Sequence, residues 1–223
     1  MPDLEFTILS VKIKQYAAVP TLHFELQIKN EIKDEEVYAA ALKCQVIIEA
    51  TKRQYDDQTK ENLVEVFGQP HRWEDTVKSL YWTTVTVPVT RFCDQTIIDL
   101  PIACSEDHIT AAGKYFYSVY NEEVPLAFLF SGTLFYQDAD NTLRITQVPW
   151  HKEAAFRMPA HLWSEMMNVY FPNVKWLPMR LDIFKKLYKL KTLQPSATIE
   201  DCLESAIDLA LKKNQTKTTE DAR

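Results

Sequence analysis

The longest apolar run in the chain extends from Val124 to Tyr136 and carries no charge. Pro125 stands near its start, and a polar stretch follows its end. A continuous apolar run of this length, closed by turn-forming residues, indicates a strand that is buried on both faces. Gly132 interrupts the run, and a glycine inside a strand indicates a bulge or a close approach of another backbone. We therefore expect this segment to form the central strand of the core.

Alternating apolar and polar residues predict further strands on both sides of this segment in the sequence. The alternation is regular over Thr21–Asn30 and Val37–Glu49, and the polar residues between them predict a hairpin. It slips once within Leu4–Ile13, near Ser10, which predicts a β-bulge. Three more strands are expected over Leu80–Val89, Thr96–Ile102 and Thr142–Val148.

Two prolines indicate where predicted strands lie at a sheet edge or end. Pro88 and Pro101 each lie within a predicted strand and lack the N–H group that a sheet requires. The strands that contain them are therefore expected to lie at sheet edges or to end at the proline.

Apolar residues at helical spacing predict five helices. The first, over Asp56–Gly68, begins with an N-cap aspartate and ends where a C′ glycine belongs. The polar tail from Lys212 onward is expected to be disordered. The other helices are expected over Ile109–Tyr120, His161–Phe171 and Leu181–Lys191, and after the N-cap Thr198.

This order of elements, strands first and helices last, is typical of an α+β protein. About seven strands with this patterning favour an immunoglobulin-like antiparallel β-sandwich with short inserted helices, followed by a C-terminal helical segment. The expected division is a β-rich domain over residues 1–149, a helical segment packed on it over 150–211, and a disordered tail over 212–223.

Composition excludes several classes of function. With only 3 glycines, neither of the glycine-rich phosphate-binding motifs can be written in this sequence. A net charge of −6 argues against a nucleic-acid partner. No apolar run reaches the ~20 residues that span a bilayer, so no membrane association is expected. The four cysteines form no CxxC pair, which favours reduced thiols in a cytoplasmic protein.

Several long motifs resemble those of an uncharacterised bacterial family, a domain of unknown function, and the resemblance extends from about Leu4 to about Leu190. It implies no activity. The resemblance further implies an accessory role, because genes of the family that this sequence resembles often lie near [NiFe]-hydrogenase genes. The polar C-terminal extension departs from the family pattern. The motifs that carry the resemblance include LKCQVIIEATKRQYD (Leu42–Asp56), RWEDT (Arg72–Thr76), VPLAFLFSGTLFY (Val124–Tyr136) and VPWHKEAAFRMPAHLW (Val148–Trp163).

One candidate site is the segment that contains Trp150, His151, Glu153 and Arg157. It has the composition of a ligand or peptide site, with the tryptophan as a platform and the arginine as a carboxylate-binding fork. The more ordinary interpretation is a corner between a strand and a helix. In that case the tryptophan seals the core, and Glu153 pairs with Arg157 four residues later on the helix.

A second candidate is the cluster of Arg72, Trp73 and Asp75. The arginine and tryptophan are suited to binding an anion or stacking on a ring. A salt bridge that holds the loop is the more ordinary interpretation. Asp75 and its neighbour Glu74 do not face one direction on either a strand or a helix, which disfavours paired acid–base chemistry.

The sequence predicts no metal site and no cofactor. Cys93, Cys104 and His108 form the best metal-ligand pattern, but a structural zinc site requires a second close pair of ligands. Ser131 precedes Gly132 without the GxSxG pattern of a nucleophile elbow. No catalytic residues are therefore assigned.

Basic residues concentrate near the C-terminal end of this acidic chain. This patch is suited to docking an acidic partner, although such a run is usually the solvated face of a helix. Its members are Lys175, Arg180, Lys185, Lys186, Lys189 and Lys191.

Three functional hypotheses follow, and the first is preferred. It is a non-enzymatic accessory or binding module that engages a protein partner through aromatic side chains near Trp73 and Trp150, and that supports assembly of a metalloenzyme such as a hydrogenase. The second is a hydrolase or other enzyme whose site is assembled from distant polar residues. The third is a chaperone that holds unfolded clients, because Val37–Glu49 and the later FPNVKWLPMRLDIF segment resemble the SecB export chaperone. The residues of the second hypothesis are Arg72, Asp75, His151, Glu153 and Arg157.

Overall fold

The computed structural model describes residues 1–32, 35–104, 110–119, 122–138, 142–174, 179–193 and 198–220, with the backbone alone from residue 213. The chain forms two compact units, Met1–Trp176 and Leu177–Arg223. This boundary differs from the expected one after residue 149, because residues 153–159 add a strand to the first unit.

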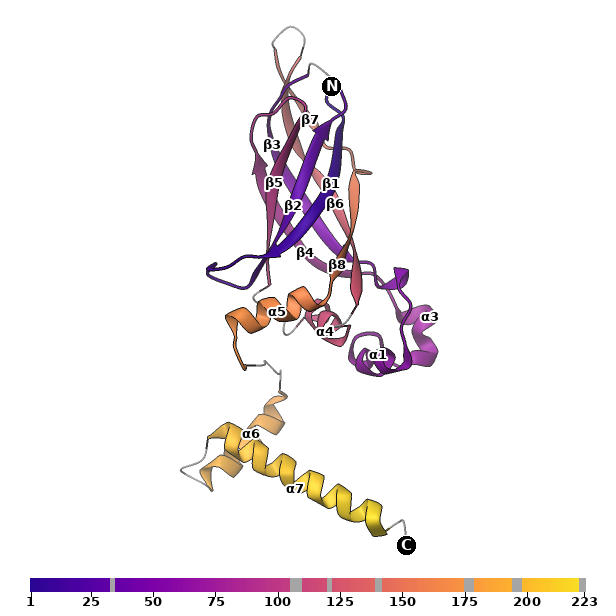
Figure 1. Ribbon diagram of the computed structural model, residues 1–223, viewed down its shortest axis with the longest axis vertical. Coiled ribbons are helices and arrows are strands. Elements are labelled where there is room, and N and C mark those ends of the chain that lie inside the picture. Colours follow the sequence, from indigo (N-terminus) through magenta and orange to yellow (C-terminus); the bar gives the residue numbers. More distant parts are fainter. Residues whose placement is uncertain are drawn as a thin grey trace. The chain divides into compact units, whose positions relative to one another are not determined.

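Two antiparallel sheets form the body of the first unit (Figure 1). One sheet has the order β1-β2-β5, and the other has the order β4-β3-β6-β7, with β8 also paired to β6. This confirms the predicted α+β class with an antiparallel β-sandwich. The strands are β1 (Leu4–Ile13), β2 (Thr21–Asn30), β3 (Val37–Ile48), β4 (Leu80–Val89), β5 (Gln95–Ala103), β6 (Glu123–Gln137), β7 (Leu143–Gln147) and β8 (Glu153–Pro159).

Aromatic side chains from both sheets fill the space between them. Phe24 of β2 contacts Phe128 of β6 edge-on, with ring centroids 5.2 Å apart. Phe6 of β1 stacks on Phe130 of β6 at 4.2 Å. These four rings are buried, so the alternation seen in the sequence places its apolar face in the core.

Strand positions agree with the sequence pattern, but one predicted connection is wrong. The bulge in β1 falls between Ile8 and Ser10, as predicted, and the strands that contain Pro88 and Pro101, β4 and β5, lie at sheet edges. The hairpin predicted between β2 and β3 does not form, because these strands belong to different sheets. The side chain of buried Asn30 accepts hydrogen bonds from the N–H groups of Asp3 and Ile32, and thereby fixes the start of the crossing. Polar residues alone cannot distinguish such a crossing from a hairpin.

β6 occupies the centre of its sheet, where β3 pairs with one edge and β7 and β8 pair with the other. Gly132 has a φ of +139°, and a Cβ at this position would overlap the Ala41 carbonyl oxygen, so no side chain fits there. This confirms the predicted close approach of another backbone. The expectation of burial on both faces is wrong for the second half of β6, where Ser131 is exposed and several neighbours are half-buried.

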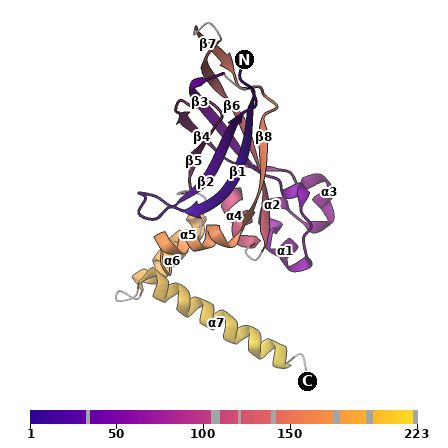
Figure 2. The same cartoon turned by 45° about the horizontal axis from the view of Figure 1, so that its top comes forward.

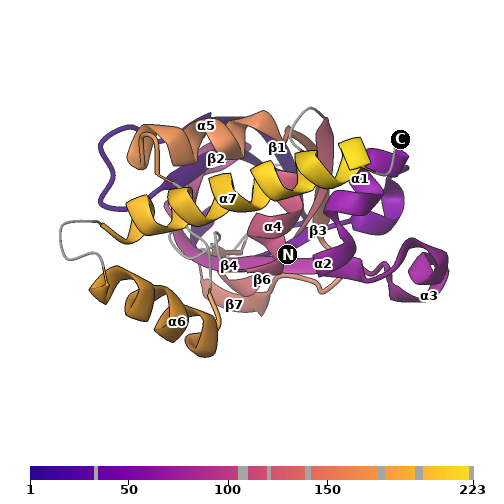
Figure 3. The same cartoon turned by 90° about the horizontal axis from the view of Figure 1, so that it is seen from below.

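Short helices gather at one end of the sandwich, where Figure 3 shows α4 in the middle and α5 beside β1 and β2. Asp56 accepts a hydrogen bond from the Thr59 N–H at 2.7 Å and is the N-cap of α1, as predicted. Gly68 ends α2 with a φ of +77°. The helical segments are η1 (Ala50–Lys52), α1 (Asp57–Asn62), α2 (Val64–Phe67), η2 (Pro70–Arg72), α3 (Trp73–Thr76), α4 (Ala111–Ser118) and α5 (His161–Tyr170).

The second unit contains α6 (Leu181–Thr192) and α7 (Ile199–Glu220). The Thr198 hydroxyl accepts a hydrogen bond from the Asp201 N–H at 3.1 Å, which agrees with the predicted cap. The backbone of α7 remains helical through Glu220, beyond the point at which the tail was expected to become disordered. Within the described residues, no helix is both long and apolar enough to cross a membrane.

Candidate functional site

β7 and β8 follow one another along the same edge of β6 and are separated by a tight turn. The Val148 N–H donates to the Gly132 carbonyl at 2.9 Å, and the Phe130 N–H donates to the Lys152 carbonyl at 2.9 Å. The three residues Pro149–His151 therefore lie opposite a single residue of β6, Ser131. This edge of the sheet is one strand interrupted by a turn.

The turn directs Trp150 into solvent. The Lys152 N–H donates to the Pro149 carbonyl at 3.1 Å, so Trp150 and His151 occupy the two central positions of the turn. Trp150 is 90% exposed, and its ring meets the His151 ring edge-on at 5.9 Å. Lys152 anchors the turn through a 2.6 Å ion pair with Asp3. The expectation that tryptophan seals the core here is wrong, because the central positions of this turn point away from the sheet.

β7 presents an unpaired backbone edge. The Asp138 N–H donates to the Thr142 carbonyl, and the Val148 N–H donates to the Gly132 carbonyl of β6. The backbone N–H and C=O groups of the even-numbered residues along β7 therefore point toward β6. Because hydrogen-bonding direction alternates along an antiparallel strand, the N–H groups of Leu143, Ile145 and Gln147 point away from β6. In the described part of the chain, no strand pairs with this outer side of β7.

Apolar side chains accompany this open edge. Ile145 is 64% exposed and Leu143 is 53% exposed, and Ile145 lies opposite the half-buried Phe135 of β6. Figure 2 shows β7 near the end of the sandwich that is remote from α1–α5. We refer to Leu143, Ile145, Gln147 and Trp150 together as the β7 surface. The sequence pattern predicted the strand and Trp150, but alternation alone does not indicate which strands become open edges.

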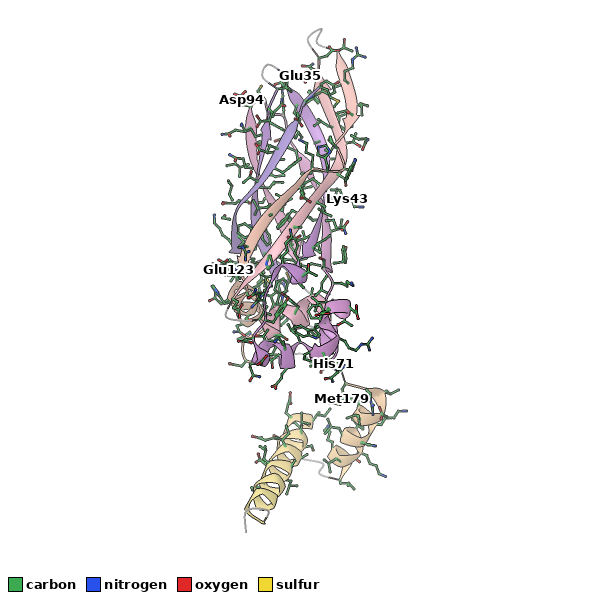
Figure 4. All side chains as sticks on the ribbon, turned by 90° about the vertical axis from the view of Figure 1, so that its right-hand side faces the viewer. Glu35, Lys43, His71, Asp94, Glu123 and Met179 are labelled. Carbon is green, nitrogen blue, oxygen red and sulfur yellow. The ribbon has the colours of Figure 1, made fainter. Side chains whose placement is uncertain are left out.

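The second cluster predicted from sequence lies elsewhere and is largely structural. Trp73 is half-buried, donates its indole N–H to the Gly68 carbonyl at 2.9 Å, and packs edge-on against Tyr55 at 5.4 Å. Arg72 and Asp75 are exposed beside it, and no ion pair is seen for either side chain within the described residues. Figure 4 shows the neighbouring His71 at the helix-bearing end of the sandwich. Trp73 therefore attaches α3 to the core.

Glu153 and Arg157 are exposed on β8 and do not form the ion pair that a helix would allow. Four residues of strand separate their Cα atoms by about 13 Å, whereas four residues of helix would bring them within contact. The expected strand-to-helix corner is absent because the chain re-enters the sheet after the turn. His151 precedes β8, so the three polar side chains are spread along one edge.

A buried charge that the sequence pattern did not single out lies near Trp73. The Arg53 side chain is only 7% exposed, pairs with Glu122, and lies 5.4 Å from the centre of the Tyr55 ring. Within the described residues, its Nε and Nη1 atoms donate no hydrogen bond. The only signal in the sequence is its place inside the long Leu42–Asp56 motif.

Two tyrosines complete this arginine cluster. The Tyr55 and Tyr115 hydroxyl oxygens lie 2.7 Å apart, and Tyr55 also donates to the Ala50 carbonyl at 2.7 Å. Burial raises the pKa of both phenols above the ordinary tyrosine value, so neither is a nucleophile near neutral pH. Glu122 balances the arginine charge. Because Tyr115 belongs to α4 and Tyr55 follows β3, the cluster holds this helix to the sheet.

A shallow hollow of about 430 Å³ lies between the β1–β2 connection and α5. Gln15, Tyr16, Val169 and Tyr170 line it. The Tyr170 hydroxyl accepts from the Ala17 N–H at 3.1 Å and donates to the Lys14 carbonyl at 2.5 Å, so it fastens the connection to α5. This lining contains no carboxylate, histidine or thiol that would support acid–base or nucleophilic chemistry.

The cysteine–histidine pattern cannot be assembled from the described residues. His108 lies outside them. Cys104 is buried, whereas Cys93 is exposed and lies 3.5 Å from a carboxylate oxygen of Glu36. In the part of the chain that the structure describes, no group of three or more metal-binding side chains comes together.

Several solved structures are distantly similar to this chain. The CARDB domain of a Pyrococcus furiosus protein, in complex with di-metal ions, is 12% identical, covers 71% of this chain and 87% of its own, and has a TM-score of 0.26. A putative late embryogenesis abundant protein is 10% identical, with coverages of 71% and 73% and a TM-score of 0.28. A β-glucosidase from Kluyveromyces marxianus is 10% identical, with coverages of 70% and 15% and a TM-score of 0.25. At such TM-scores these likenesses carry no argument.

Family membership is clear by contrast. No curated protein matches the chain closely enough to count as a relative. Residues 1–216 match a family of unknown function, DUF6084, which spans nearly the whole sequence. The chain therefore belongs to this family of unknown function.

Proposed function

We propose that this protein is a binding module whose β7 surface accepts an extended segment of a partner protein as an added β-strand. The observation that carries the proposal is the open edge of β7, where three outward N–H groups accompany two exposed apolar side chains. In strand addition, main-chain hydrogen bonds supply affinity and alternate side chains supply specificity. The expected partner segment is extended, with apolar residues at alternate positions.

The other edges of the sandwich are less suited to this role. Where the two sheets meet, β4 contacts β5 on one side and β1 contacts β8 on the other. Each of these edge strands is therefore shielded by a strand of the other sheet. β4 and β5 also carry prolines, which discourage strand pairing. β7 has neither protection. Exposed apolar strands at open edges invite pairing with other chains, and Trp150 adds an aromatic anchor of the kind enriched at interfaces.

The hydrolase hypothesis has less support. A catalytic set needs side chains within hydrogen-bond reach of one another. Glu153 and Arg157 are about 13 Å apart along β8. Arg72 and Asp75 belong to η2 and α3 instead, which follow β3 at the other end of the sheet.

Two finer parts of the proposal rest on the sequence, the partner class on the family resemblance and the compartment on the cysteine usage. The partner class is a metalloenzyme such as a hydrogenase, whose assembly this protein supports as an accessory factor. The expected compartment is the cytoplasm. The chaperone hypothesis stays a prediction that an aggregation-suppression assay with a denatured client tests.

The test uses a phage-displayed library of 12-residue random peptides, selected on the immobilised full chain. The key variant is Ile145→Pro, which removes an outward N–H group and leaves the hydrogen bonds between β6 and β7 in place. The matched control is Ile97→Pro on β5, because Ile97 is exposed to a similar degree, 56%. We expect enriched peptides with alternating apolar residues, whose binding is lost in Ile145→Pro and retained in the control.

Circular dichroism spectra and urea midpoints of both variants establish that each is folded before binding is compared. Peptides that bind wild type and Ile145→Pro equally would refute strand addition at β7. Loss of binding in the Ile97→Pro control alone would place the interaction on the other sheet, and would also refute the proposal.

A further inference from the structure

The helical unit leaves much apolar surface uncovered. α6 and α7 contact each other, and Leu187 and Cys202 are their buried apolar residues in the described part of this unit. Exposed apolar surface of this extent marks an interaction site in a soluble protein. The large apolar side chains that remain exposed in the described part of this unit are Met179, Leu181, Ile183, Phe184, Tyr188, Leu190, Leu193, Leu203, Ile207, Leu209 and Leu211.

These side chains form a line on each helix. On α7, Leu203, Ile207 and Leu211 recur every four residues and therefore lie on one face. A helix whose apolar residues extend over more than one narrow stripe packs against more than one neighbour. α7 has Cys202 buried on one stripe and this exposed line on another, so α6 alone does not satisfy it.

The line on α6 consists of Leu181, Phe184 and Tyr188, which are separated by three and four residues. All three are exposed, although Leu187 of the same helix is buried. Both helices of the unit therefore offer an apolar line to a further helix.

The two helices carry opposite charges. Four lysines and one aspartate give α6 a formal charge of +3. Four carboxylates and one lysine give residues 199–212 of α7 a formal charge of −3. Within the described residues, none of the α6 lysines forms an ion pair with a carboxylate of α7. Their charges are therefore available to a second molecule.

We propose that a second copy of this chain covers these lines, so that two α6–α7 units associate as a four-helix bundle. In a two-fold symmetric dimer, each contact occurs twice. Packing α6 of one copy against α7 of the other brings +3 against −3 at both contacts. Packing α6 against α6 would bring like charges together, which is unfavourable. The apolar lines supply affinity, and the charges select this pairing.

The test is a charge swap in trans on the full-length protein, measured by native mass spectrometry and sedimentation. Lys185→Glu with Lys189→Glu makes both helices negative, and Glu204→Lys with Asp208→Lys makes both positive. Each double variant alone should dimerise about 10-fold or more weakly than wild type, because like charges now meet at both contacts. Mixed together, the two variants should recover dimers that contain one copy of each.

Lys43→Glu with Lys78→Glu, two exposed lysines of the first unit, is the matched control and should dimerise as wild type does. A wild-type chain that sediments at 26.0 kDa at all concentrations would overturn the proposal, because the lines would then be covered within one molecule or by another protein. Dimers that form equally in all variants would also overturn it, because their interface would lie elsewhere.

Discussion

Replacing Gly132 by alanine tests the arrangement of the central strand most sharply. The new Cβ would overlap the Ala41 carbonyl oxygen and lie 3.1 Å from the Ala41 carbonyl carbon and 3.2 Å from the Leu42 Cα. All three atoms belong to the backbone of β3, which cannot rotate aside as a side chain would. The overlap occurs where β3 and β6 form the middle of the sheet.

Two contributions add in this variant. Overpacking of a close-packed core costs about 1 to 3 kcal/mol. A residue other than glycine at a φ of +139° costs about 1 to 3 kcal/mol more. We therefore expect Gly132→Ala to lower the free energy of unfolding by about 4 kcal/mol. With an m-value of about 2 kcal/mol/M, the urea midpoint falls by about 2 M.

Gly68→Ala is the matched control. Gly68 also has a positive φ, +77°, but no atom lies within 4 Å of the position that an alanine Cβ would take there. Gly68→Ala should therefore lower the free energy of unfolding only by the backbone contribution, about 1 to 2 kcal/mol. Tryptophan fluorescence during urea unfolding reports on this unit, because Trp82 and Trp163 are buried in it. If Gly132→Ala is no less stable than Gly68→Ala, the close backbone contact between Gly132 of β6 and Ala41 of β3 is refuted.

Three further predictions concern groups near the core. Glu122→Gln leaves Arg53 buried without a counter-charge and should cost about 1 to 2 kcal/mol in urea unfolding, less than for a fully buried pair because the glutamate is half-exposed; an unchanged midpoint contradicts this. A thiol reagent at pH 8 should modify exposed Cys93 in the folded protein, although the hydrogen bond to Glu36 raises the pKa of its thiol, and should modify Cys44 only on unfolding, because burial raises the pKa of Cys44 to about 12; equal rates contradict this. Burial raises the pKa of Tyr115 in the folded state, so the unfolded chain loses this proton first and stability should fall as pH rises above about 10. Tyr115→Phe should make that alkaline loss shallower, and an identical pH profile would contradict the assignment.

The sequence was informative wherever one local rule determined the structure. Alternation located β2 without error in its bounds, and the slip near Ser10 identified the bulge in β1. Pro88 and Pro101 indicated edge strands, because a proline cannot donate a hydrogen bond to a strand on the side where its N–H is missing. Gly132 indicated a close backbone contact for the same kind of reason.

Long-range pairing was not accessible in this way. The polar residues after Asn30 are compatible both with a hairpin and with a crossing between sheets, and only the partners of β2 and β3 decide between them. The segment after Trp150 was expected to begin a helix, yet Glu153–Pro159 pairs with β6. The alternation there is short, and its pairing depends on an edge of β6 that the local sequence does not reveal.

The candidate site was predicted in part. Trp150 was named as a candidate binding platform, although a tryptophan that seals the core was the more ordinary interpretation, and the structure places it exposed at the tip of a turn. Leu143 and Ile145 were assigned only as part of a hairpin strand. Their exposure follows from β7 being the last strand of its sheet, which is a property of the topology and not of their own sequence.

The most direct test of the binding proposal is residue-resolved amide hydrogen exchange by NMR, with and without a peptide selected on the full chain. Strand addition predicts that exchange slows at Leu143, Ile145 and Gln147, whose N–H groups point outward. The intervening residues, already bonded to β6, should change little. Slowed exchange confined to other strands or to the helices, with these three amides unchanged, would contradict the assignment of β7 as the binding edge.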